Sequence, residues 1–74
     1  MTWRYVAARE TIGGEKYWTV REYFFGVPGG DVWTVDPVCA SGTSKEELIR
    51  DLKMMKKDVK DGVWLDLDTG ELHD

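Results

Sequence analysis

The pattern of hydrophobic and polar positions predicts a helix over residues 45–59. Apolar side chains recur there at i, i+4, i+7 and i+11, the spacing of one face of an α-helix. They are Leu48, Leu52, Met55 and Val59. Ile49 flanks this stripe. A stripe of this kind is stable in water only when it is buried, so we expect it to pack against another element.

Residues that suit helix ends lie on both sides of this segment. Thr43 or Ser44 is the expected N-cap, because a hydroxyl there accepts from an unpaired backbone N–H of the first turn. Glu46 or Glu47, three residues later, completes a capping box. Gly62 is the expected left-handed stop.

Aromatic and β-branched residues before the helix predict three strands, over residues 3–9, 16–25 and 31–36. Glycine pairs at 13–14 and 29–30 supply the turns between them, since glycine adopts positive φ without penalty. After the helix, residues 63–67 alternate like an edge strand, and residues 71–74 either fold back or fray. We therefore expect residues 1–74 to form one small α+β domain: a three-stranded antiparallel sheet packed on one helix (β-β-β-α), with a short C-terminal strand or hairpin.

The strand at 16–25 carries large side chains on both faces. We assign the more hydrophobic face, with Trp18, Val20 and Phe24, to the helix. The neighbours expected beside it are Val6, Trp33 and Val35.

The opposite face of this strand then has no obvious cover, because one helix covers one face of a sheet. It carries Tyr17, Thr19, Arg21, Tyr23 and Phe25. Tyrosine and arginine are enriched where protein surfaces meet. We predict a partner-binding or self-pairing surface made by Tyr17, Arg21, Tyr23 and Phe25. The alternative is that the C-terminal segment, with Trp64 and Leu65, folds across this face.

The formal net charge of -4 argues against a general phosphate-binding surface and so against direct nucleic-acid binding. The single cysteine, Cys39, excludes an internal disulfide and suits a reducing cytoplasm. No apolar run has the length of a signal peptide or a membrane span. We expect a cytoplasmic protein with no membrane partner.

The usual catalytic residue types are scarce, which favours a protein that is not an enzyme and needs no cofactor or metal. His73 lies near a fraying end, without an orienting partner for general base catalysis, and we expect it to be solvated. Cys39 lies between Val38 and Ala40 and is expected to be a small buried side chain. Asp66 and Asp68 are expected to be a solvated charge row on an edge strand.

Five acidic residues and no lysine or arginine occur from position 61 onward. They are Asp61, Asp66, Asp68, Glu71 and Asp74. Such carboxylates suit an acidic inhibitor that imitates phosphates, as a phage anti-defence protein of the anti-CRISPR kind does. The alternative is a tail that only promotes solubility.

Three segments, at 18–25, 33–38 and 42–48, resemble a family of small uncharacterised bacterial proteins, a resemblance that implies no known activity. They read Trp18-Thr19-Val20-Arg21-Glu22-Tyr23-Phe24-Phe25, Trp33-Thr34-Val35-Asp36-Pro37-Val38 and Gly42-Thr43-Ser44-Lys45-Glu46-Glu47-Leu48. The strand-strand-strand-helix order and the Gly-x-Ser-x-Glu-Glu-Leu helix start are also similar to HicB-type antitoxins, whose domain binds and blocks a toxin. The Pro-Asp-Leu-Pro-Gly-type turn of that family is missing here.

The leading hypothesis is a non-enzymatic protein-binding module or inhibitor that acts through an aromatic sheet face. Its expected partner is another protein, either a nucleic-acid-binding protein or a toxin. A homodimer is the alternative, as are the acidic anti-CRISPR-like mimic and the HicB-like antitoxin.

Overall fold

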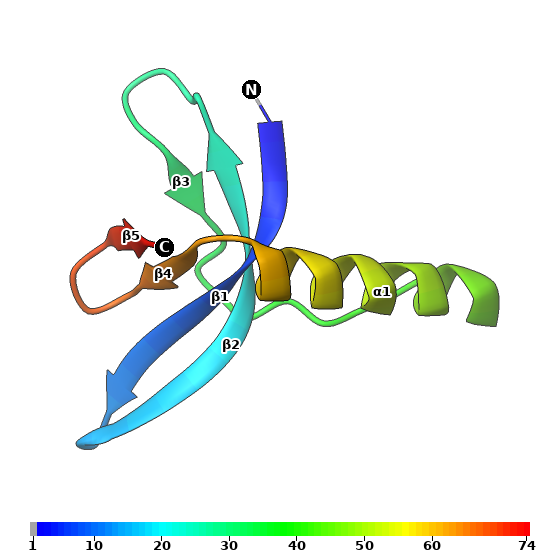
Figure 1. The fold of residues 1–74 in the computed structure, drawn as a ribbon, viewed down its shortest axis with the longest axis horizontal. Helices are drawn as coiled ribbons and strands as arrows, with labels where there is room; N and C mark the ends of the chain where they lie inside the picture. The colour runs from blue at the N-terminus through cyan, green and yellow to red at the C-terminus, as the bar shows by residue number, and fades with distance from the viewer. Residues whose placement is uncertain (1) are drawn as a thin grey trace.

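The computed structural model describes residues 2–74, which form one helix and a five-stranded sheet (Figure 1). The elements are β1 (Thr2–Ile12), β2 (Glu15–Phe25), β3 (Val32–Trp33), α1 (Lys45–Asp61), β4 (Trp64–Asp66) and β5 (Glu71–His73). Their spatial order in the sheet is β3-β2-β1-β4-β5. The predicted α+β class with one helix is confirmed, and β1, β2 and β3 pair antiparallel as predicted. The predicted sheet is incomplete, because the C-terminal hairpin β4–β5 joins the same sheet through parallel pairing of β4 with β1.

The β1–β2 hairpin is the longest element of the sheet, and its register runs from Thr2 opposite Phe25 to Ile12 opposite Glu15. Gly13 and Gly14 connect the strands with φ of 60° and 85°. Two successive positive φ values match the twist of a tight hairpin turn and are easily adopted by glycine. This turn therefore determines which side chains share a face.

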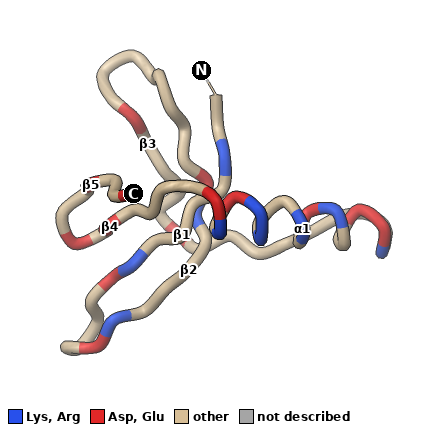
Figure 2. Tube along the Cα trace, viewed as in Figure 1, with Lys and Arg blue, Asp and Glu red and all other residues tan. Residues whose placement is uncertain are grey.

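The start of α1 follows the predicted capping pattern. The Ser44 hydroxyl accepts from the backbone N–H of Glu47 (3.1 Å). The Glu47 carboxylate in turn accepts from the backbone N–H and the hydroxyl of Thr43, at 2.7 and 2.6 Å. These two hydrogen bonds, the one from the hydroxyl first, lower the pKa of Glu47. Glu46 and Glu47 lie in the first turn, where negative charge suits the helix dipole, and the last turn carries both Lys60 and Asp61 (Figure 2).

The expected left-handed stop at Gly62 is wrong, since its φ of -100° and ψ of -177° are extended. Glycine is favoured there by close approach instead. A Cβ on Gly62 would lie 2.7 Å from the Asp58 carbonyl oxygen and 2.5 Å from an Arg4 guanidinium nitrogen. Any larger residue would push the Arg4 side chain away from the helix end.

One face of the sheet, called the inner face here, forms the hydrophobic core. Its buried members are Val6, Ala8, Tyr23 and Leu65, and Phe25, Trp33, Leu67 and Leu72 pack against them partly buried. The sheet curls so that β3 and the β4–β5 hairpin close over this face. The curled sheet thus covers the face for which the sequence predicted no obvious cover.

The helix packs on the opposite side of the sheet, the outer face. The Tyr5 hydroxyl donates to the Asp51 carboxylate (2.5 Å), and the Tyr5 backbone N–H donates to Asp58 (3.1 Å). Burial, together with the bonded Asp51 carboxylate, raises the pKa of Tyr5 to about 12. Tyr5 is opposite Glu22, so it shares a face with Trp18, Val20 and Phe24. The predicted side for the helix is therefore correct.

The neighbours predicted for that side are placed differently. Val6 is opposite Arg21 and Trp33 is opposite Tyr23, so both belong to the inner face. Val35 is 86% exposed. Trp18 also lies away from the helix, with 55% of its surface exposed.

The apolar stripe of the helix is only partly covered. Met55 is its one buried member, whereas Leu48, Ile49 and Leu52 are exposed. Figure 1 shows the reason: α1 meets the sheet with its C-terminal half, and its N-terminal half projects beyond the strands.

Candidate interaction surface

The four side chains predicted to bind a partner do not share an uncovered face. Arg21 and Tyr23 are only 4% exposed, and Phe25 packs against the core. Tyr17 alone is largely exposed, at 47%. The expectation of an exposed tyrosine face is wrong because the curled sheet and Leu65 of the C-terminal segment cover it. The alternative is therefore correct for Leu65 but not for Trp64, which lies on the outer face.

Arg21 is tied to the protein itself. Its guanidinium donates to the carbonyl oxygens of Thr34 (3.3 Å) and Val35, and forms an ion pair with Glu10 at 3.7 Å. The guanidinium thus holds the segment after β3 against β2.

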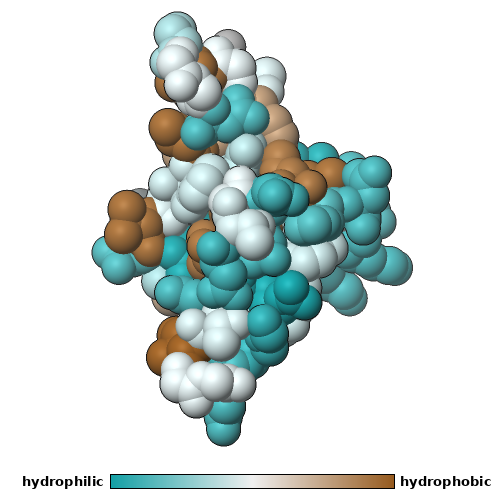
Figure 3. All heavy atoms as spheres, turned by 90° about the vertical axis from the view of Figure 1, so that its left-hand side faces the viewer, coloured by the Kyte–Doolittle hydropathy of each residue, from teal (hydrophilic) through white to brown (hydrophobic). Residues whose placement is uncertain are grey.

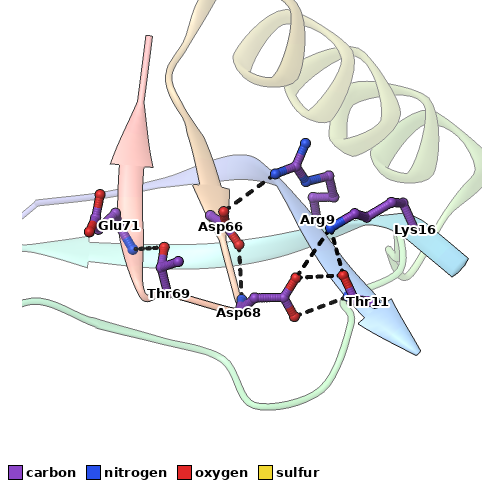
Figure 4. A network of polar contacts seen from close by, with 7 residues as sticks. All are labelled: Arg9, Thr11, Lys16, Asp66, Asp68, Thr69 and Glu71. Carbon is purple, nitrogen blue, oxygen red and sulfur yellow. Dashed lines mark hydrogen bonds and ion pairs between the residues drawn. The ribbon is translucent and has the colours of Figure 1, made fainter. Parts of the chain in front are cut away.

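The acidic residues of the C-terminal segment are also in part engaged within the protein (Figure 4). Asp66 is 7% exposed and pairs with Arg9 at 3.4 Å. Asp68 accepts from the backbone N–H and the hydroxyl of Thr11, at 3.1 and 2.6 Å, and lies 3.7 Å from Lys16. These bonds, from the Thr11 hydroxyl first, lower the pKa of Asp68. The predicted solvated charge row on an edge strand is wrong for Asp66, which is buried on a strand that β5 covers; Asp68 is bonded but stays exposed. Asp61, Glu71 and Asp74 stay exposed.

Aromatic rings and one guanidinium lie together on the outer face of the sheet. Trp18, Trp64, His73 and Arg9 form this tryptophan platform. Trp18 meets Trp64 edge to face, with 5.2 Å between ring centroids. The Arg9 guanidinium lies 4.7 Å from the Trp64 ring centroid and 5.8 Å from that of Trp18. Contacts of this kind are favourable through the ring quadrupole.

The platform is assembled by strand register across four strands. Arg9 on β1 is opposite Trp18 on β2, and Ala7 is aligned with Trp64 on β4. Trp64 is in turn opposite His73 on β5. Residues from positions 9 to 73 therefore meet on one face because β4 inserts next to β1.

His73 is not the solvated tail residue that we expected. It belongs to β5, and its ring stacks on Trp64 with centroids 4.5 Å apart and planes 22° apart. The pairing of β5 with β4 holds this ring in place, so the C-terminal residues complete the platform.

The Asp66 carboxylate fixes the position of the Arg9 guanidinium in the platform. Asp66 accepts from Arg9 at 3.4 Å and from the backbone N–H of Asp68 at 3.0 Å. Because Asp66 is buried and bonded to both, the Arg9 guanidinium is held over the rings before any partner arrives. Such preorganisation lowers the entropic cost of binding.

The exposed part of the platform is the Trp18 ring. Other large apolar groups are exposed along the projecting half of α1, at Leu48, Ile49 and Leu52, and Figure 3 shows separate hydrophobic patches on the face that it draws. The Arg9–Trp18 pair could be predicted from the sequence, because the glycine turn at 13–14 sets the register of the hairpin. Trp64 and His73 were not, since nothing local specifies the parallel register of β4.

The structure also places the remaining candidate residue, Cys39. Cys39 is exposed and not buried as expected. Over residues 2–74 the structure has no pocket and no group of three or more potential metal ligands. No helix in this range is long and apolar enough to cross a membrane.

Comparison of the chain with protein-family models, with curated proteins and with solved structures gives no match. The similarities to small bacterial proteins and to HicB-type antitoxins therefore stay predictions.

Proposed function

We propose that this protein is a non-enzymatic protein-binding module whose contact surface is the tryptophan platform. The observation that carries the proposal is the state of Trp18, which is 55% exposed although its ring is fixed on Trp64 and beside Arg9. Tryptophan and arginine are the residue types that most often dominate binding energy at protein interfaces. A rigid, half-exposed indole loses little side-chain entropy when a partner covers it.

The chemistry of the platform limits the partner. Arg9 and Lys16 are already neutralised by Asp66 and Asp68, so the surface offers rings more than net charge. We therefore expect a partner that presents an apolar or aromatic side chain to Trp18. A toxin is the partner class that the HicB resemblance implies.

Affinity purification from cells that naturally contain the protein, followed by mass spectrometry, tests this proposal. We expect a stoichiometric partner whose binding falls at least about tenfold with Trp18→Ala, a typical loss for a hot-spot residue. Trp3→Ala is the matched control, because Trp3 is 48% exposed but lies outside the platform. Circular dichroism verifies that both variants fold. Equal binding by wild type and Trp18→Ala would refute the assignment.

The phosphate-mimic alternative has less surface than the sequence suggested. Asp66 is buried and Asp68, although exposed, is bonded to Thr11, which leaves Asp61, Glu71 and Asp74 as the exposed acids without such a bond to their side chains among residues 2–74. Mimicry of phosphates predicts that the complex weakens steeply with added salt. A complex that is held by the platform is expected to be nearly insensitive to salt.

A further inference from the structure

The half of β2 next to the Gly13–Gly14 turn has an edge that is not paired with another strand. The backbone of Glu22 faces away from β1, since its N–H donates to the Thr34 hydroxyl (3.1 Å) and its carbonyl accepts from the Thr34 N–H (3.0 Å). The carbonyl of Val20 accepts from the Val38 N–H (2.9 Å) on the same side. Backbone groups alternate along a strand, so those of Lys16 and Trp18 also point outward.

These outward groups have no partner within residues 2–74. No backbone or side-chain hydrogen bond reaches the N–H or carbonyl of Lys16 or Trp18 on that side. Figure 1 shows the β1–β2 hairpin extending past the other strands here. Unpaired strand edges are templates for another strand.

The side chains that would normally guard such an edge are turned onto the sheet. The Lys16 ammonium donates to the Thr11 hydroxyl (2.8 Å) and lies 3.7 Å from Asp68. The Trp18 ring lies toward Trp64. The lysine is thus held over its own sheet, where it does not block an approaching strand.

We propose that the edge at Lys16 and Trp18 pairs with the same edge of a second copy, as an antiparallel two-fold dimer. One symmetric register uses all of these open groups. The Val38 bond closes the edge at Val20, and the turn at Gly13 and Gly14 closes it at the other end. The open groups therefore match only when Lys16 of each copy is opposite Trp18 of the other. Each such pair exchanges both of its backbone hydrogen bonds.

The side chains fit this register. Tyr17 of each copy lies directly opposite Tyr17 of the other at the two-fold axis, an aromatic cross-strand pair. Each Lys16 lies beside an indole, and Glu15 lies opposite Thr19, so no like charges face each other. Tyr17 is 47% exposed and its hydroxyl bonds only Glu15, which leaves the ring free to make this contact.

Sedimentation equilibrium over a concentration series tests the dimer. We expect the mass to rise from the 8.5 kDa of one chain to about twice that value. Tyr17→Glu places two carboxylates together at the axis and is expected to keep the protein monomeric. Ile12→Glu is the control, because Ile12 is 55% exposed in the same hairpin but one strand away from the edge. It adds the same charge and should dimerise like the wild type.

Amide hydrogen exchange tests the register itself. Protection of the Lys16 and Trp18 amides should increase with protein concentration, whereas the Thr19 amide, which faces β1, should not change. A single 8.5 kDa species up to roughly 1 mM would overturn the proposal. So would a dimer that Tyr17→Glu leaves intact, or protection that appears only with a foreign partner. The proposal does not rest on the binding function of the platform, since it is argued from the open backbone groups of Lys16 and Trp18 and is tested at Tyr17, which lies on the opposite face from the Trp18 ring.

Discussion

Carboxylates hold several separate parts of this protein in position. Asp51 accepts from the Tyr5 hydroxyl and from the backbone N–H of Ser41 (2.9 Å), which joins the helix to β1 and to the segment before it. Asp68 joins the end of β4 to Thr11 at the far end of β1. The pKa of each is lowered, first by the side-chain hydroxyl that donates to it. Both acids therefore stabilise the fold in the ionised form.

The lowered pKa of Asp68 predicts a loss of stability in acid. The ionised carboxylate contributes fully above its ordinary pKa of 3.8, and the contribution is lost as the pH falls through the lower folded value. We expect Asp68→Asn to be less stable than wild type at pH 7, with a difference that shrinks as the pH falls below about 4. Urea denaturation at a series of pH values measures this difference.

Asp74→Asn is the control for this experiment, because Asp74 is exposed and no side-chain bond to it is found among residues 2–74. It should follow the wild type at each pH. A gap between wild type and Asp68→Asn that stays constant from pH 7 to acid would show that Asp68 does not act through its ionised form.

At the scale of elements, the helix was the most predictable part of the chain and its packing the least. The apolar period and the Ser44 cap are local signals, and the helix begins at Lys45 as expected. The period alone does not say how much of a stripe is covered. Only the C-terminal half of α1 meets the sheet, so Leu48 and Leu52 carry the pattern of core residues without being buried.

Alanine substitutions along this stripe should show that stability depends on the burial of each side chain and not on its place in the apolar pattern. Met55 is 7% exposed and Leu52 is 51% exposed. We expect Met55→Ala to lower the free energy of unfolding by about 2–4 kcal/mol, because it removes buried apolar contacts and leaves a cavity. Leu52→Ala should cost less than about 1 kcal/mol. Chemical denaturation measures both, and similar losses would mean that another surface covers Leu52 in solution.

The same contrast applies to the candidate surface. The glycine turn at 13–14 is a local signal from which the pairing of Arg9 with Trp18, and of Val6 with Arg21, follows directly. The same register places Val6 on the inner face with Arg21, and not on the helix side as predicted. The other half of the platform depends on β4 lying parallel to β1, and that arrangement is a property of the whole chain that no short segment encodes.

At the scale of the molecule, stability depends on the sheet being complete. Leu65 on β4 is fully buried, and Leu72 on β5 packs against the same core. β5 also covers the outer edge of β4. A small domain buries a limited fraction of its surface, so the loss of even a short strand should lower the stability of the whole domain.

A chain that ends at Gly70 is expected to unfold at least about 10 °C below the wild type, since loss of the Leu72 side chain alone should cost about 2 kcal/mol. A chain that lacks only Asp74 keeps β5 and should melt like the full sequence. Circular dichroism during heating measures both. Equal melting temperatures for all three chains would show that β5 contributes nothing to the core.

The central place of β1 also has a consequence for biosynthesis. β1 and β2 leave the ribosome before β4 and β5 and can close into a hairpin, but Val6 and Tyr23 lack the cover of Leu65 until residues 64–73 have also left the ribosome. During this interval the nascent hairpin exposes hydrophobic side chains that can aggregate or bind chaperones. Slow codons placed between the helix and β4 would lengthen that interval and should lower the yield of native protein.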